Sequence, residues 1–466
     1  MIVKNILALR KFSMFLQGII VLQPLYLGIN TPYYTIKRFK IPESSVDLYI
    51  TKINITMQLG YFVGLLLANF YFYVFPRWIQ RYNLYISVVT NWLTVTYSTL
   101  LLLSYLVKGD EGSLTFYFYM LVMCALVFGI NESFAMNVGI VELPWFTASI
   151  PASGLMVVAF QFFFSAIAMK LGSQRIEFTI ISCQVAILIF LCAFTSVLWM
   201  VSYMQISHDA YQIDEASYQE MELEAQKYYY PADYSFLKRM WMSRYPFVAS
   251  AVGLGYLYGF YPAIIPYKLA NLRDAYYIDL VSIFAGSSVA LMVSMLCEYT
   301  RFGPNKNWEA TDSKWVYSLF VAIPYLLLPV FFINPLHFPE TPVFKVILEN
   351  RGVVALLAVS FNMMSCLLTV VGYSASSKQT NRENDPDMAP LNVFITYTVM
   401  LCVILYSQGY LTFYGMVESG KLTVVEGGKG KRFFYWLGKS FVYGWNRFRL
   451  ILVSDIRADI LKIKEL

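Results

Sequence analysis

A few polar side chains interrupt stretches of sequence that are otherwise almost entirely apolar. Asn131, Glu132 and Asn137 lie in one such stretch, and Ser282 and Ser287 lie in another. Because a polar group is costly in lipid, such residues usually face protein or a water-filled path, where they can bind a polar solute. We interpret all five as candidates for a substrate path, with Glu132 as a carboxylate that could carry a proton. The alternatives for the first three residues are hydrogen bonds between helices or a helix that ends earlier than predicted, and for the serines they are bonds to the helix backbone.

A second group of candidates accompanies residues that break helices. In "GYLYGFYPAIIPYKL" the rings of Tyr258 and Tyr261 stand beside glycines and prolines, where they could stack on a flat solute. The segment is also a predicted hinge, because glycine permits close helix approach and proline interrupts helical hydrogen bonding. The hinge residues are Gly255, Gly259, Pro262 and Pro266. Asn362, in a later apolar stretch, is a further candidate for the path.

Three acidic residues are predicted to lie at the ends of apolar stretches. Asp279 and Glu298 bracket one stretch, so we expect both side chains to reach the membrane interface. Glu142 directly precedes "LPW", and the residue before a proline disfavours helix, so we expect Glu142 at a helix exit.

No pattern of residues indicates enzyme chemistry. The two histidines, His208 and His337, do not have metal-ligand spacing, and the six cysteines never form C-x-x-C. The sequence has no phosphate-binding loop, dinucleotide motif or serine-triad order. We therefore predict a protein that is not an enzyme, that uses no metal or cofactor and that binds no nucleic acid.

Composition indicates which elements carry these residues. Of the 466 residues, 58% are hydrophobic and only 14% are charged, whereas soluble domains carry about 25% charged residues. Continuous apolar runs of the required length, roughly 20 residues, predict an all-α polytopic membrane protein with about eleven spanning helices. The predicted spans are 13–35, 53–75, 84–107, 115–141, 150–172, 177–203, 247–269, 276–299, 313–334, 352–375 and 389–416.

The longest polar connection divides these spans into six and five. We predict an N-terminal six-helix bundle over 1–203, a cytoplasmic linker over 204–246 and a C-terminal five-helix bundle over 247–417. The remaining tail, 418–466, is basic and rich in aromatic residues. It is interpreted either as an amphipathic helix along the membrane surface or as a solvated helical tail.

Several segments resemble the equilibrative nucleoside transporter family. The most specific is "DSKWVYSLF", from Asp312, which is similar to the family's D-S-R-W-x-P-S-L at the start of the ninth helix. "INESFAMNVG" resembles I-N-S-F-G-A-x-x-Q-G, and "PASGLMVVAF" resembles P-x-x-x-S-G-x-x-x-A. Pro24 stands at the family's proline in the first span. These short motifs occur in most of the predicted spans, in the same order as in the family. The high content of Tyr and Phe is similar to that of divergent apicomplexan members of the family.

The resemblance implies a fold and a set of substrate contacts, some of which differ here. The implied fold is a six-plus-five pseudo-symmetric bundle resembling the major facilitator type. The family's substrate-contacting glutamine in the fourth helix corresponds to Val138. In the best register of the eighth helix, the family's Asp and Arg, which serve the ribose hydroxyls, correspond to Ile283 and Ser287. Part of the family's binding chemistry is therefore absent at these positions.

These observations predict a facilitative or proton-linked carrier of nucleosides, nucleobases or a related small polar solute, working by alternating access. Its expected partners are that solute and the lipid bilayer, while protein partners are unknown. We expect an integral, multi-pass protein of the plasma membrane or an intracellular membrane. The alternative is a membrane protein that keeps the transporter fold without nucleoside transport and serves another solute, a pore or a surface scaffold.

Overall fold

A computed structural model describes the chain over residues 2–42, 45–107, 112–170, 176–205, 235–308, 314–380, 388–422, 429–449 and 456–458. All regular elements of these ranges are helices. Nine of them are long and apolar enough to cross a membrane. The prediction of an all-helical, multi-span membrane protein is therefore confirmed. Most of the predicted linker 204–246, and the tail residues 450–455 and 459–466, lie outside the described residues.

Some long helices follow the predicted spans to within two residues, whereas others begin well before the predicted starts. The main helices of the first half of the chain are α1 (Ile2–Val21), α4 (Val46–Val74), α6 (Asn83–Leu106), α7 (Leu114–Val138), α8 (Leu143–Lys170) and α9 (Ile176–Trp199). Those of the second half are α13 (Arg244–Leu257), α14 (Leu272–Tyr299), α18 (Arg351–Ala375) and α19 (Met388–Glu418). Shorter helices are α2 (Gln23–Asn30), α3 (Pro32–Arg38), α5 (Arg77–Gln80), α12 (Phe236–Met242), α15 (Ala322–Leu327), α16 (Val330–His337) and α17 (Pro342–Glu349). The close matches include α6, α18 and α19, whereas α1, α4 and α8 begin well before the predicted starts at 13, 53 and 150.

Three predicted spans are interrupted rather than continuous. The first is divided into α1, α2 and α3, with Pro24 and Pro32 in the first turns of α2 and α3. The ninth begins as a 3-10 helix, Trp315–Val321, and continues as α15 and α16. In the seventh, the helix ends at Leu257 and consecutive turns follow to residue 269. Because proline has no backbone N–H, it is accommodated at the start of a helix but interrupts its middle.

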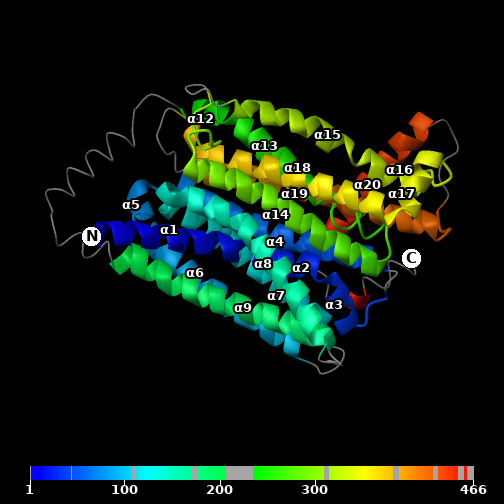
Figure 1. Cartoon of the computed structure of the whole chain (residues 1–466), viewed down its shortest axis with the longest axis horizontal. Helices are drawn as coiled ribbons and strands as arrows, with labels where there is room; N and C mark the ends of the chain where they lie inside the picture. The colour runs from blue at the N-terminus through cyan, green and yellow to red at the C-terminus, as the bar shows by residue number, and fades with distance from the viewer. Residues whose placement is uncertain are drawn as a thin grey trace.

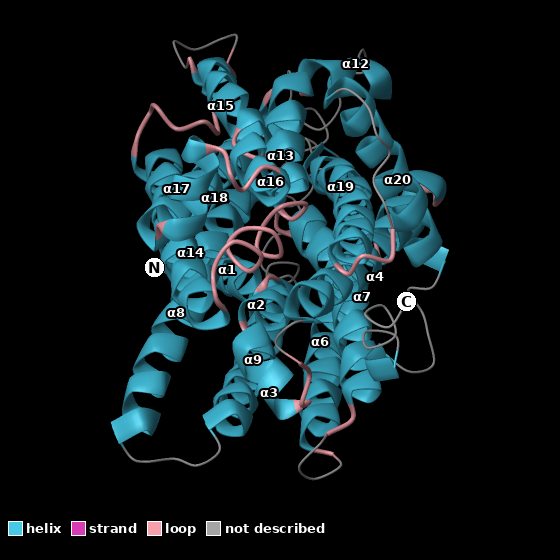
Figure 2. Cartoon of the chain, turned by 90° about the vertical axis from the view of Figure 1, so that its right-hand side faces the viewer, coloured by secondary structure: helices cyan, strands magenta, loops and turns pink. Residues whose placement is uncertain are grey.

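The helices pack as two groups that meet along two pairs. In the first half α1 packs on α8 and α9, α4 on α7, and α6 on α7 and α9; in the second half α13 packs on α18 and α19, and α14 on α18. The main contacts between the halves are α4 with α19 and α8 with α14. Figure 1 shows the long helices running side by side, with α3, α16 and α17 toward one end and α5 and α12 toward the other. In the view along the bundle, α6 and α9 lie opposite α13 and α18 (Figure 2).

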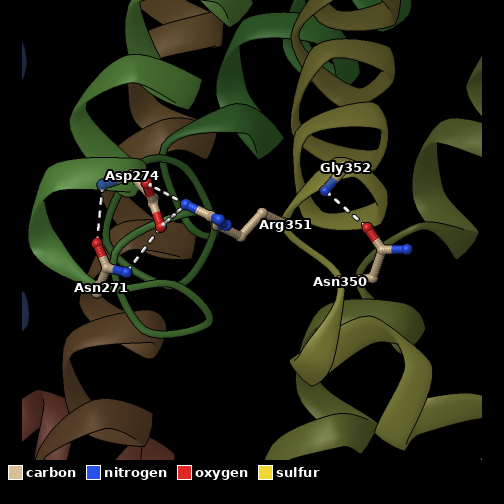
Figure 3. Close-up of polar contacts among 5 residues, drawn as sticks. All are labelled: Asn271, Asp274, Asn350, Arg351 and Gly352. Atoms are coloured by element: carbon tan, nitrogen blue, oxygen red, sulfur yellow. Dashed lines mark hydrogen bonds and ion pairs between the residues drawn. The ribbon is translucent and has the colours of Figure 1, made fainter.

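Polar contacts tie the first turns of α14 and α18 together. Asn271 caps α14 by accepting a hydrogen bond from the backbone N–H of Asp274 at 2.9 Å, and Asn350 caps α18 in the same way through Gly352 at 2.9 Å. The Arg351 guanidinium donates to both carboxylate oxygens of Asp274, at 3.1 and 3.0 Å (Figure 3). These residues lie at the helix starts, where such exposed pairs position ends rather than add much stability.

The basic tail folds back on the last long helix. α20 (Lys429–Arg449) packs along α19, and a Cβ added to Gly444 would lie 2.5 Å from the carbonyl oxygen of Leu405. Phe434, Phe441 and Trp445 remain exposed on its outer side. One face of α20 therefore packs closely on α19 while another exposes large apolar side chains, and both interpretations of the tail stay predictions.

Candidate functional site

A cavity lies between the two halves of the molecule. Its volume is about 70 Å³. The first half contributes Leu22, Tyr26, Glu132 and Ile150, and the second half contributes Leu254, Leu257, Tyr258, Tyr261, Ile283, Ser287, Ala290, Asn362, Ser365, Cys366, Thr369, Val370, Tyr373 and Tyr397. The lining is mostly apolar and aromatic with a few polar groups, which is typical of small-molecule sites.

Six residues singled out from the sequence come together around this cavity. They are Glu132, Tyr258, Tyr261, Ile283, Ser287 and Asn362. They come from α7, α14, α18 and the turns after α13, so chain positions more than 200 residues apart meet here. Ile283 and Ser287 are both buried, while the chosen register of the eighth helix stays a prediction.

Glu132 stands where the halves touch. Its side chain is 2% exposed, and its carboxylate accepts a hydrogen bond from the Tyr61 hydroxyl on α4 at 2.8 Å. The Tyr61 ring stacks on Tyr397 of α19 with a centroid distance of 4.8 Å and an interplanar angle of 11°. The only carboxylate among the described lining residues is therefore bonded to a side chain that itself forms the α4–α19 contact.

Asn362 lies on a polar stripe of α18. The thiol of Cys366 donates to Asn362 Oδ1 at 3.3 Å, and α14 approaches so closely that a Cβ on Gly286 would lie 2.9 Å from the Cys366 sulfur. Thr369 and Tyr373 continue the stripe along the cavity wall. The sequence analysis missed all of these except Asn362. Their spacing of three and four residues is the signal that identifies one face of a helix.

Ser287 and Ile283 form the part of the wall where α14 meets α8. A Cβ on Gly154 of α8 would lie 3.3 Å from an Ile283 methyl carbon and 3.1 Å from the Tyr26 hydroxyl, and it would also meet the Ser287 hydroxyl. Glycine at this position therefore permits the close approach of the two halves.

Five predicted path residues lie elsewhere. Pro24 is buried in α2, and Val138 is partly buried against the core. Asn137, at the end of α7, accepts a hydrogen bond from Asn83 at 2.7 Å. Ser282 donates to the carbonyl of Ile278 at 2.7 Å, in its own helix. Asn131 belongs to a separate polar network.

The Asn131 network joins three helices of the first half. Asn131 Nδ2 donates to Gln17 Oε1 on α1 at 3.0 Å, and Thr90 on α6 donates to Asn131 Oδ1 at 2.9 Å. Gln17 also donates to Asn91. All four side chains are buried. Asn131 therefore forms hydrogen bonds between helices, which was the alternative interpretation of this residue.

Replacing Asn131 by alanine is expected to lower the free energy of unfolding by about 1–3 kcal/mol, because the buried Gln17 and Thr90 groups would each lose a partner. Thermal unfolding of the detergent-solubilised protein measures this change. Ser282→Ala is the matched control, since its hydroxyl bonds only its own helix. Equal melting temperatures for the two variants would contradict the structural role of the network.

The predicted hinge glycines lie against α19. A Cβ on Gly255 would lie 3.0 Å from a methyl carbon of Val399, and one on Gly259 would meet Val403. Pro262 and Pro266 follow in the non-helical turns, both after cis peptide bonds. The segment thus combines tight packing at its helical end with an irregular backbone beside the cavity. Hinge motion here stays a prediction.

The expectation for Asp279 was wrong. Its side chain is fully buried rather than at the interface, and it accepts a hydrogen bond from the Tyr261 hydroxyl. The reason is that α14 begins at Leu272, one turn earlier than predicted, so Asp279 lies about 10 Å inside the helix. Glu298, at the other end, is partly exposed and pairs with Lys11 at 3.6 Å, and its place at the membrane interface stays a prediction. Glu142 lies in a short 3-10 turn between α7 and α8, where it is buried and accepts from Tyr203 at 3.3 Å.

Comparisons with known proteins find solved structures of similar fold but no protein of similar sequence. No family model matches the chain, and no curated protein matches it. The xylose transporter XylE from E. coli, in a partially occluded inward open conformation, is similar with a TM-score of 0.54 and 11% identity over 97% of this chain and 99% of that chain. An auto inhibited POT family peptide transporter is similar with a TM-score of 0.52 and 11% identity, over 96% of this chain and 98% of that chain.

The architecture is therefore that of the major facilitator type, the superfamily to which a further XylE structure, at a TM-score of 0.53 and 10% identity, is assigned. The nucleoside transporter NupG has a TM-score of only 0.42 at 11% identity. At such identities the likeness describes the fold alone.

Proposed function

We propose that this chain is a membrane carrier that moves a small polar solute by alternating access. The observation that carries the proposal is the cavity between the halves, which is lined from both and contains one buried carboxylate, that of Glu132. In transporters of such folds the solute binds near the middle of the membrane, between helices that can bend, and rocking of the halves exposes it to each side in turn. The break between α1 and α2, the helix α2 and the irregular segment after α13 border this cavity.

We further propose nucleosides or nucleobases as the substrate class. The rings of Tyr26, Tyr258 and Tyr397 suit a planar base, because aromatic faces stack on bases with little sequence preference. Glu132 and Asn362 supply an acceptor carboxylate and an amide for the polar edge of such a solute. Ile283 and Ser287 cannot reproduce an Asp and Arg pair, so ribose hydroxyls would have to bond elsewhere in the lining.

The missing pair also favours the second candidate function. A protein that keeps this fold but serves another solute, a pore or a surface scaffold would retain the helix packing without the ribose contacts. The two candidates differ in an observable property, the passage of a labelled solute.

Uptake into proteoliposomes tests the proposal. Purified protein is reconstituted, and the entry of radiolabelled adenosine, hypoxanthine and a panel of sugars and amino acids is followed at several pH values. Saturable uptake of a nucleoside or nucleobase that an excess of unlabelled solute inhibits is the expected result. Uptake of another solute alone would support the carrier function but contradict nucleosides and nucleobases as the substrate class. No uptake across the panel would contradict the carrier. Immunostaining of intact cells tests the plasma membrane as its location.

Filling the cavity is expected to block transport. Ser287→Trp places a large ring in a space of about 70 Å³. We expect the initial uptake rate to fall at least about tenfold, which corresponds to about 1.4 kcal/mol, because the ring would occupy the volume that the solute needs. Ser288→Trp is the matched control, because Ser288 is the next residue of α14 and its bond to Phe284 O lies on the exposed face. Similar rates for both variants, at equal amounts of reconstituted protein, would exclude this cavity as the solute site.

A further inference from the structure

A second buried carboxylate lies beside the cavity without lining it. Asp279 of α14 has an exposed fraction of 0%. Its Oδ1 accepts from the Tyr261 hydroxyl, whereas its Oδ2 has no hydrogen-bond partner among the described residues. None of the ion pairs found in the described ranges includes it. The residue therefore has the burial of a functional carboxylate but only one hydroxyl to stabilise a charge.

Among the residues that the structure describes, the titratable groups that face Asp279 are tyrosines. Tyr258, Tyr261 and Tyr267 come from the turns after α13, and Tyr276 comes from the preceding turn of α14. Tyr34 of α3 lies behind them, close to Tyr267 and Tyr276. Because no ion pair among the described residues includes Asp279, an ionised Asp279 would carry a large desolvation penalty, whereas the neutral acid would not.

Two neighbours of Asp279 line different spaces. Tyr261 lines the central cavity. Tyr276 lines a second pocket of about 160 Å³, together with Tyr33 and Tyr34 of α3, Lys37 and Arg273. This second pocket contains two cationic side chains and tyrosine hydroxyls, so it is a polar space in contrast to the cavity.

Tyrosines of the two halves contact one another at the second pocket. The hydroxyls of Tyr34 and Tyr276 are 3.3 Å apart, and the ring of Tyr33 stacks on Tyr276 with centroids 5.2 Å apart. Tyr276 also donates to Gln161 of α8 at 3.3 Å. α3 and α8 belong to the first half and α14 to the second, so a rocking motion of the halves would separate these contacts and open the pocket toward Asp279.

We propose that Asp279 is a proton-binding site, and that the proton enters from the pocket of Tyr33, Tyr34 and Tyr276 when these tyrosines separate. In the closed arrangement described here the carboxyl is neutral, and opening allows it to exchange its proton with water. The expected consequence of this site is that a proton gradient accelerates solute movement, and this consequence rests on the proposed carrier function. The site itself is a property of the chain whether or not the solute class is right.

Two measurements on the full chain test the site. In proteoliposomes, an inwardly directed proton gradient is expected to accelerate uptake by the wild-type protein and by D274N, but not by D279N. Asp274 is the matched control, because it lies on the same helix and pairs with Arg351 outside the site. A D279N protein that responds to the gradient as the wild type does would overturn the proposal.

Infrared spectroscopy of the purified protein provides a readout that needs no transport. Titration with pH is expected to show the C=O stretch of a neutral carboxylic acid, part of which disappears in D279N but persists in D274N and E132Q. If D279N leaves the band unchanged, Asp279 does not hold the proton. If the wild type transports nothing, the carrier proposal fails, while the infrared result still decides the protonation of Asp279.

Discussion

Replacing Glu132 by alanine is expected to reduce the initial uptake rate roughly 10- to 100-fold, because a hydrogen bond to a charged group contributes about 1.5–3 kcal/mol. Glu132 is the only carboxylate that lines the cavity among the described residues, and its removal leaves the buried Tyr61 hydroxyl without its partner. Tyr61→Phe, which keeps the stacking on Tyr397, is expected to cause a smaller loss. Uptake rates at several solute concentrations measure both changes.

The control for this prediction is Glu298→Gln, which removes a carboxylate at the partly exposed end of α14 and is expected to leave uptake within about twofold of the wild type. E132A uptake within the same limit would show that the carboxylate has no part in solute binding. The pH profile separates the two buried acids: E132Q is expected to lower uptake at every pH while the response to a proton gradient remains. A flat pH profile for E132Q would assign the proton to Glu132 instead of Asp279.

Gly64→Leu is expected to destabilise the first half by about 3 kcal/mol or more, because the new side chain cannot fit between packed helices. A Cβ at Gly64 would meet the carbonyl oxygen of Leu126 on α7, and one at the neighbouring Gly60 would lie 2.6 Å from the carbonyl oxygen of Val122. These contacts are with backbone atoms, which cannot move aside as a flexible side chain can. Thermal unfolding in detergent is expected to show a lower midpoint and less monodisperse protein.

Gly415→Leu provides the matched control. Gly415 is also inside a long helix, α19, but a Cβ there has no atom within 4 Å. We expect its melting temperature to stay close to that of the wild type, so the comparison removes the intrinsic effect of replacing glycine in a helix. A Gly64→Leu protein that melts no lower than Gly415→Leu would mean that α4 and α7 can separate without loss of stability.

Much of the fold could be predicted from local sequence. An apolar run must become a helix in a membrane, since its backbone groups have no other partners there, and the run from Leu114 to Val138 required no knowledge of its neighbours. Glu132, Ser287 and Asn362 were recognisable for the same reason, because polar groups are conspicuous in such runs. Their convergence on one cavity from three helices was not recognisable, because pairing of helices depends on contacts between distant segments.

The failures have a common cause. Asp279 was placed at the interface because the apolar run was taken to begin at Tyr276, whereas capping by Asn271 starts the helix one turn earlier. Asn131 and Glu132 are adjacent in sequence but belong to different sites, because consecutive residues of a helix point about 100° apart. Tyr61 was not singled out at all, since one tyrosine among 37 has no distinguishing local feature.

By itself the sequence determined that this protein is helical, crosses the membrane many times and contains a few intramembrane polar groups, since hydrophobic burial and backbone hydrogen bonding in lipid are local requirements. Only the tertiary structure decided which polar groups face a shared space. The meeting of α4 with α19 and of α8 with α14 places Glu132 and Ser287 on one cavity, and the start of α14 at Leu272 leaves Asp279 buried. Such placements follow from packing between segments far apart in the chain, which no local pattern specifies.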